Sequence, residues 1–243
     1  MAKIMSGSAS DYLSSVRNRD KVLGIVQFAP VALAEPLSKI GSEKLAAAFL
    51  KTARVAEGYR TLTRFSGMID MLSPSSLQSL AKVRDPIMRK VAAFQFFCSF
   101  CFFPYEHAAF LATYGVLDES KAGQYAGMAV FFWLYSLLTR TGGLCYHLLL
   151  EYPYISPKAT DAASVKRRLD FRKHVLELIR TVCFAIFAWS VLPAKGKPQL
   201  LANPTGVLYP LHRAVELASP NALNLSQTSR GVLGLVASIT EFL

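Results

Sequence analysis

Apolar residues recur at three- and four-residue steps along most of this chain, which is the spacing of helices with one apolar face. Residues 18–35 follow this pattern, which stops where a proline follows. Ser42 and Glu43 then provide an N-cap and a first-turn acid for a longer helix. Residues 77–83 form a further short pattern that ends before Pro86. These patterns predict an all-α fold.

The longer helix carries apolar and basic residues on different faces. Its apolar stripe contains Leu45, Phe49, Ala56 and Tyr59. Basic side chains crowd its sides at positions Lys44, Lys51, Arg54, Arg60 and Arg64. A basic amphipathic helix of this kind is suited to lie in an anionic membrane surface. A helix in an ordinary bundle with a solvated basic face has the same periodicity, so the pattern leaves both interpretations open.

Two apolar segments occupy the centre of the chain and predict a transmembrane helical hairpin over residues 91–150. The first is uncharged over residues 91–105 and continues beyond Glu106. The second is uncharged over residues 122–139 and continues beyond Arg140. A bilayer core needs roughly 20 apolar residues, and the second segment is the clearest span. The hairpin separates two further regions, residues 1–90 and 151–243.

Glu106 and Arg140 interrupt the predicted hairpin. Ionisable groups at membrane depth are costly, and they usually pair or line a wet path. In one interpretation they lie inside the membrane, where they form an ion pair or Arg140 bonds to carbonyls near Gly142 and Gly143. In the other, which we favour, the spans end at Tyr105 and Thr139 and both charges lie at the membrane interfaces.

Small residues four positions apart occur in two of the apolar segments. Gly123 and Gly127 lie in the second segment of the hairpin, and Gly234 and Ser238 lie in the C-terminal tail. Spacing of this kind lets a second helix approach closely. We interpret both pairs as candidate helix contacts.

The region after the hairpin begins with a second basic cluster and ends in an apolar tail. The cluster consists of Lys166, Arg167, Arg168, Arg172 and Lys173. The uncharged run that follows, residues 181–194, is too short to span comfortably, so it predicts an interfacial, half-inserted, buried or tilted helix. Residues 193–210 are rich in proline and glycine and predict a linker.

The composition favours a membrane protein. The 243 residues include 27 Lys+Arg and 16 Asp+Glu, for a net charge of +11, yet 52% are hydrophobic and the mean hydropathy is +0.31. The apolar content excludes disorder, and so few charges are unusual for a nucleic-acid-binding protein. Net charge is +7 over residues 1–90, −2 over 91–157 and +6 over 158–243. By the positive-inside rule both termini are cytosolic, and the acidic turn at Asp118 lies on the other side.

No residue pattern predicts catalysis, a metal or a cofactor. Nucleophile-elbow, P-loop, dinucleotide-binding and HExxH motifs do not occur, and the four histidines are scattered singly. The four cysteines lie in apolar runs, and the Cys98-x-x-Cys101 spacing fits packing on one helix better than redox or metal chemistry. We therefore expect a protein that is not an enzyme.

Several segments resemble the peroxin-11 family. Arg19-Asp20-Lys21, with Gln27-Phe28 shortly after, is similar to the start of that family, and residues 44–65 resemble its basic membrane-remodelling helix. Residues 176–188 and 231–242 are similar to its closing helix and apolar tail. The aromatic centre and the length are most similar to the glycosomal integral membrane proteins of kinetoplastids. One departure is that Arg180 is not followed by the acidic residue that family members often have.

The resemblance implies a multi-pass protein of the peroxisomal or glycosomal membrane that promotes elongation and fission of that membrane. It implies anionic phospholipids and further copies of the chain as partners, together with the fission machinery and a receptor for peroxisomal membrane-protein import. It implies no nucleic acid. A solute channel is the alternative function, in which an oligomer of hairpins passes small metabolites along Glu106, Arg140 and His147.

Overall fold

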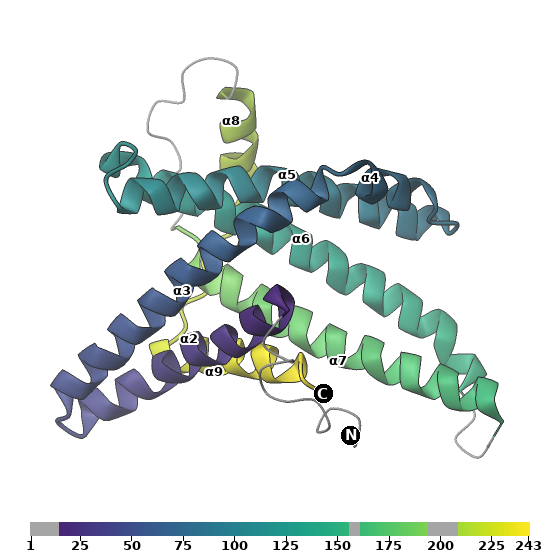
Figure 1. Cartoon of the computed structure of the whole chain (residues 1–243), viewed down its shortest axis with the longest axis horizontal. Coiled ribbons are helices and arrows are strands. Elements are labelled where there is room, and N and C mark those ends of the chain that lie inside the picture. Colours follow the sequence, from purple (N-terminus) through teal and green to yellow (C-terminus); the bar gives the residue numbers. More distant parts are fainter. Residues whose placement is uncertain (1–14, 156–160, 194–208) are drawn as a thin grey trace. The chain divides into compact units, whose positions relative to one another are not determined.

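The structure is a computed structural model that describes residues 15–155, 161–193 and 209–243, and all regular structure in these residues is helical (Figure 1). The chain divides into two compact units. Unit 1 combines the residues up to Ser66 with Leu225–Leu243, and unit 2 is Gly67–Asn224. The predicted all-α class is confirmed. Residues 194–208 of the predicted linker lie outside the described residues.

Unit 1 contains α2 (Val16–Lys39), most of α3 (Glu43–Met71) and α9 (Gln227–Thr240). The C-terminal tail, which the sequence placed in a third region, therefore belongs with the N-terminal helices, and α2 lies beside α9 (Figure 1).

The helix α2 is longer than the pattern predicted, because it continues through Pro30 and Pro36. Proline removes one backbone donor and crowds the carbonyl four residues before it, so it usually ends a helix, but α2 continues for three residues after Pro36. The turn into α3 uses Gly41 at a φ of 82°, a left-handed conformation that glycine adopts without steric cost. Ser42 then accepts the first backbone bond of α3, from Ala46, as its N-cap role predicted.

Besides the end of α3, the described residues of unit 2 form two short and three long helices. α4 (Pro74–Ala81) and α5 (Pro86–Thr113) are capped by the side chains of Ser73 and Asp85. α6 (Ala122–Glu151) follows the 3-10 turn η1 (Glu119–Lys121), and the 3-10 turn η2 (Tyr152–Tyr154) follows α6. The last two helices are α7 (Ala162–Val191) and α8 (Tyr209–Ala218).

The second basic cluster belongs to the same helix as the uncharged run that follows it. It lies in the first half of α7, where the Asp161 side chain accepts a bond from the Ser164 amide and caps the helix. The apolar pattern marked only the later part of this helix, because Lys and Arg, which favour helices on exposed faces, give no apolar signal.

The three long helices of unit 2 pack side by side in alternating directions. Tyr105 of α5 contacts Tyr125 of α6, while Asp85 near the start of α5 meets Tyr146 near the end of α6. Between α6 and α7, Trp133 contacts Phe187 and His147 contacts His174. Both neighbours of α6 are therefore antiparallel to it, so α5 and α7 run parallel to each other.

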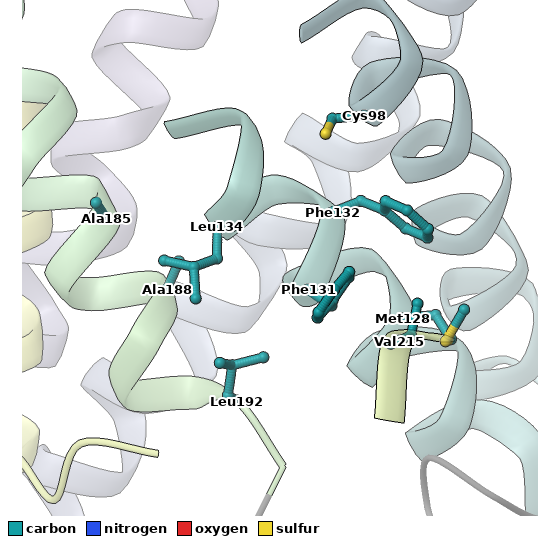
Figure 2. Packing of buried hydrophobic residues seen from close by; sticks show 9 residues of the cluster. All are labelled: Cys98, Met128, Phe131, Phe132, Leu134, Ala185, Ala188, Leu192 and Val215. Atoms are coloured by element: carbon teal, nitrogen blue, oxygen red, sulfur yellow. The ribbon is translucent and has the colours of Figure 1, made fainter. Parts of the chain in front are cut away.

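The core of unit 2 lies in the N-terminal half of α6. Met128 and Leu134 are completely buried there. Figure 2 shows Leu134 beside Ala188 of α7 and Met128 beside Val215 of α8, so α6 is the central helix of the unit. The other end of the unit, around His147, has no member of this apolar cluster.

Candidate membrane interface

Arg60 of α3 is buried, with 9% of its surface exposed, and binds two side chains of α2. Its Nε and Nη2 donate to the two carboxylate oxygens of Asp20 at 2.9 and 3.2 Å, and its Nη1 donates to Gln27 Oε1 at 2.6 Å. Its guanidinium carbon also lies 5.9 Å from the centre of the Phe28 ring. A bidentate arginine–carboxylate pair is strong and geometrically specific. Arg60 therefore fastens α3 to α2.

The charge of Arg60 also changes the acidity of Asp20. Partial burial acts to raise the pKa of Asp20, but the hydrogen bonds and positive charge of Arg60, helped by Arg64, outweigh it and hold the pKa below its ordinary value of 3.8. Asp20 is consequently ionised at neutral pH, as the pair with Arg60 requires.

The helix α9 approaches α2 closely enough that its glycines cannot be replaced without a clash. A Cβ on Gly231 would lie 2.2 Å from the backbone nitrogen of Ala32, and a Cβ on Gly234 would lie 2.2 Å from Phe28. Across the same contact, a Cβ on Gly24 of α2 would lie 2.7 Å from Ser238 Oγ. Gly234 and Ser238, the small pair predicted in the tail, thus lie against α2.

Three further hydrogen bonds link the ends of α2 and α9. Lys21 Nζ donates to the carbonyl of Glu241 at 2.9 Å. Glu35 Oε2 accepts from the amide and the hydroxyl of Thr228, both at 3.0 Å, while Lys39 donates to its other oxygen at 2.8 Å. The bond from Lys39 and those from Thr228 lower the pKa of Glu35 to about 2. Polar contacts therefore hold both ends of this helix pair.

The structure separates the predicted basic residues of α3 into two groups. Lys44, Lys51 and Arg54 are exposed, and Arg64 is half-buried. Arg60 is a correction to the sequence-based assignment, because its guanidinium binds Asp20 and Gln27 and is not available to lipid headgroups. The sequence showed one charge every few residues and could not tell which of them had a buried partner.

The apolar surface of α3 also differs from the predicted stripe. Leu45 and Tyr59 are each 47% exposed, but Phe49 is half-buried and Ala56 is 5% exposed. Ala56 is therefore not on an insertion face in this structure. The most exposed apolar residues of the helix are Val55 at 72%, Leu62 at 56% and Ile69 at 59%.

Sequence reasoning missed this second stripe, although its seven-residue spacing was visible. Positions seven apart share one side of a helix, and at about 100° per residue this side is opposite Arg60. Lys44 and Lys51 continue the same side towards the start of α3, because they too are seven apart. We call these two lysines, with Val55, Leu62 and Ile69, the outer face of α3.

The basic cluster of α7 is also on the surface of its unit. Lys166, Arg167, Arg172 and Lys173 are exposed, and Arg168 is half-buried. These residues lie in the half of α7 that precedes its apolar run. The cluster is therefore accessible to anionic groups, and its contact with a membrane surface is a prediction from its charge.

Two helices of the described chain are long and apolar enough to cross a membrane, by length and composition: Pro86–Thr113 (α5) and Ala162–Val191 (α7). Only 6% of the most apolar stretch of α5 is buried in the structure, against 22% for α7. α6, which contains the segment expected to be the clearest span, does not reach the same hydropathy. Polar residues such as Gln124 and Arg140 lower its average.

The two charges predicted inside the hairpin do not meet. Arg140 donates to Glu177 of α7, with its Nε at 2.9 Å and its Nη2 at 2.5 Å, and Arg180 lies 3.6 Å from the same oxygen. On α5, the turn opposite this part of α6 contains Val91, and Glu106 lies roughly 22 Å further along the helix at 1.5 Å per residue. The pair of Glu106 with Arg140 is therefore excluded.

The remaining predicted features of unit 2 have simpler surroundings. Gly127 is buried and Gly123 is exposed, so only one of the pair lies inside the unit. All four cysteines are free thiols, and Cys98 is buried in the apolar cluster. Among the described residues, no group of three or more histidine, cysteine or acidic side chains could hold a metal ion.

A comparison with known families identifies the chain. The model of the family described as peroxisomal biogenesis factor 11 (PEX11) matches residues 7–241, which include both units. No curated protein and no solved structure matches the chain. The resemblance to the peroxin-11 family is thus confirmed, and this is not known as a family of enzymes. The chain belongs to the peroxisomal biogenesis factor 11 family, whose members act in the proliferation and remodelling of the peroxisomal membrane.

Proposed function

We propose that this protein elongates the peroxisomal or glycosomal membrane and prepares it for fission by inserting the outer face of α3 into the cytosolic leaflet. The observation behind this proposal is that face itself. Val55 and Leu62 are exposed opposite the fastened side of the helix, and Lys44 and Lys51 precede them on the same side. Exposed apolar residues next to exposed lysines match the two layers of an anionic leaflet.

The mechanism depends on area. A helix whose apolar face is buried about 5–10 Å deep occupies the headgroup region of one leaflet only. That leaflet expands relative to the other, so the bilayer becomes convex on the side that bears the helix. Several copies of the chain concentrate the effect, so we expect a homo-oligomer. We also expect the fission machinery and a membrane-protein import receptor as partners, on the basis of the family.

For the topology we propose two crossings, made by α5 and α6, with both termini cytosolic. α5 and α7 run parallel, so both can cross only if α6 returns between them, which gives three crossings. However, α2 and α9 pack against each other and must lie on the same side, which requires an even number. α9 has 14 residues, about 21 Å at 1.5 Å per residue, and is too short to cross by itself. The uncharged run of α7 begins only after Arg180 and is short for a crossing, which favours α7 as the helix that does not cross.

The test of remodelling uses the full chain in vesicles of phosphatidylcholine, with or without phosphatidylserine. We expect tubulation in the anionic vesicles only. Changing Lys44, Lys51 and Arg54 to Gln should shift the balance between inserted and free α3 by roughly a hundredfold, at about 1 kcal/mol for each charge. The matched control changes three exposed lysines elsewhere, Lys82, Lys90 and Lys121, to Gln. Equal tubulation by the two variants would contradict the proposal.

The test of topology uses single cysteines in a cysteine-free chain and a membrane-impermeant maleimide. In intact organelles, a cysteine at Ser164 in the first turn of α7 should react, and one at Ser120 between α5 and α6 should react only after the membrane is opened. Protection of the cysteine at Ser164 would rule out the two-crossing arrangement.

A further inference from the structure

Three helices of unit 1 meet at Gly24 of α2. A Cβ at this position would lie 2.7 Å from Ser238 Oγ of α9 and 3.6 Å from Arg60 Nη1 of α3. Asp20 and Gln27, which bind Arg60, lie one turn before and one turn after Gly24 on α2. We call these five residues the Gly24 junction.

We propose that, through the Gly24 junction, the C-terminal helix α9 determines which side of α3 meets the membrane. This inference rests on the proposed function of α3. It makes Arg60 and Asp20 positioning residues, not lipid ligands. It also gives α9 a task in unit 1 besides that of a membrane-associated tail.

The first argument is that α3 has two sides that could enter a bilayer. One is the outer face, represented by Val55 and Leu62. The other is the stripe predicted from the sequence, which contains Leu45, Phe49 and Ala56. In an isolated helix both sides are available, and the basic residues flank both. Something outside α3 must therefore select one of them.

The second argument is that the junction buries one side of α3, so that this side cannot enter the bilayer. Ala53, Ala56 and Arg60 lie close together around the helix and are at most 9% exposed, while Val55 and Leu62 on the opposite side are more than half exposed. Because Arg60 binds two residues of α2 in fixed geometry, α3 cannot rotate without breaking three hydrogen bonds. The side that remains available is the outer face.

The third argument connects this selection to α9. Phe28 lies next to the guanidinium of Arg60 and is also the residue that a Cβ on Gly234 would strike at 2.2 Å. Gln27 and Phe28 are both buried, with at most 9% exposure. The residues of α2 that contact Arg60 are therefore positioned by α9. Loss of α9 would weaken the contacts of Gln27 and Phe28 with Arg60.

The test is a change that prevents docking of α9 and leaves its charge and helicity intact. Gly231→Ala adds one methyl group, which would lie 2.2 Å from the backbone of Ala32, where no side chain can rotate away. Alanine is also the better helix former, so α9 itself should not unfold. Gly67→Ala in α3 is the matched control, because a Cβ there meets nothing within 4 Å.

The readout is the orientation of α3 in the full chain on phosphatidylserine-containing vesicles. All four native cysteines lie in unit 2, so in a cysteine-free chain an environment-sensitive probe can be placed at Leu62 or at the half-buried Phe49. In the wild type and in Gly67→Ala, the probe at 62 should enter lipid and the probe at 49 should not. In Gly231→Ala the difference between the probes should fall roughly tenfold or more, because overpacking of this size displaces a helix. Tubulation should fall with it.

The possible outcomes separate the two proposals. If the wild type tubulates vesicles and Gly231→Ala keeps the wild-type probe difference, the role of α9 is wrong while the function of α3 stands. If the wild-type probe at 62 stays in water and no tubulation occurs, the function itself is wrong. Unchanged emission of Trp133 and Trp189, both in unit 2, verifies that Gly231→Ala has not unfolded the rest of the chain.

Discussion

The two units of this molecule are both helical, but different kinds of contact hold them. In unit 1, glycines bring α2 and α9 together at backbone distance, and a buried arginine binds α3. In unit 2, large apolar side chains such as Met128 and Leu134 fill the space between helices, and aromatic pairs line it. The two described helices that are long and apolar enough to cross a membrane, α5 and α7, are both in unit 2.

The difference follows from what each unit has to specify. Aromatic and aliphatic side chains bury much area but tolerate small shifts, because many arrangements of similar volume have similar energy. A bidentate arginine pair and a glycine contact tolerate little, because a shift breaks hydrogen bonds or causes a backbone clash. The contacts of unit 1 therefore fix the orientation of α3, whereas those of unit 2 bury a large apolar area.

The largest expected effect is on unit 2. Leu134→Ala should lower its free energy of unfolding by about 3 kcal/mol, because the side chain is completely buried in the core around α6. Denaturant unfolding of the protein in detergent, followed by tryptophan emission, measures the loss. Leu149→Ala, at a position that is 75% exposed, is the control and should change little. A similar loss in both variants would mean that unit 2 is not organised around this core.

The next effect is on unit 1. Arg60→Met should lower the free energy of unfolding of unit 1 by about 2 kcal/mol, because it leaves Asp20 partly buried without its partner. Because both tryptophans are in unit 2, tryptophan emission should stay unchanged while hydrogen exchange in α2 and α3 accelerates. Arg54→Met removes an exposed charge of the same kind and should have almost no effect on exchange. Equal acceleration by both variants would remove the special role of Arg60.

The ion pair of Arg140 with Glu177 in unit 2 should contribute less to the free energy of unfolding than the pair of Arg60 with Asp20 in unit 1. Arg140→Leu should lower the free energy of unfolding by about 1 kcal/mol, because the two side chains are 35% and 26% exposed and solvent screens them. Arg140→Leu reconstituted into a bilayer also tests the channel hypothesis, which predicts that its conductance differs from that of the wild type. A loss as large as that of Arg60→Met would show that the two units do not differ in this respect.

The smallest expected effect is a pH dependence confined to unit 1. The pKa of Glu35 is about 2 in the folded chain and 4.5 ordinarily, so the stabilisation from its bonds to Lys39 and Thr228 is complete above about pH 4.5 and is lost as the pH falls towards 2. Asp20, whose folded pKa is also lowered, adds a loss in the same direction below its ordinary value of 3.8. Hydrogen exchange of α9, corrected for intrinsic rates, should accelerate across this range. In Glu35→Gln the upper part of this pH dependence should be absent, and its persistence would exclude Glu35 as the source.

The residues that led to the family resemblance have a shared physical explanation. Asp20, Gln27 and Phe28 were recognised only as a motif at the start of the chain, and in the structure all three surround Arg60. The missing acid after Arg180 has a counterpart as well, because Glu177, three residues before it, lies beside that arginine and Arg140.

The sequence alone determined the helical class, the positions of most helices and the contrast between basic flanks and an apolar centre. Periodicity, caps and composition are local properties, and each can be read from neighbouring residues. It also determined the family, because the motif order is a linear feature. It grouped the lysines of α3, which are exposed in the structure, with Arg60, which is buried.

Only the tertiary structure decided which arginine is buried, which side of α3 is exposed and where the C-terminal helix binds. Each of these depends on residues far apart in the chain: Arg60 is 40 positions from Asp20, and Thr228 is 193 positions from Glu35. A helix with charges and apolar residues on several sides fits more than one environment equally well. The partner that covers one of its sides makes the choice, and no local pattern contains that partner.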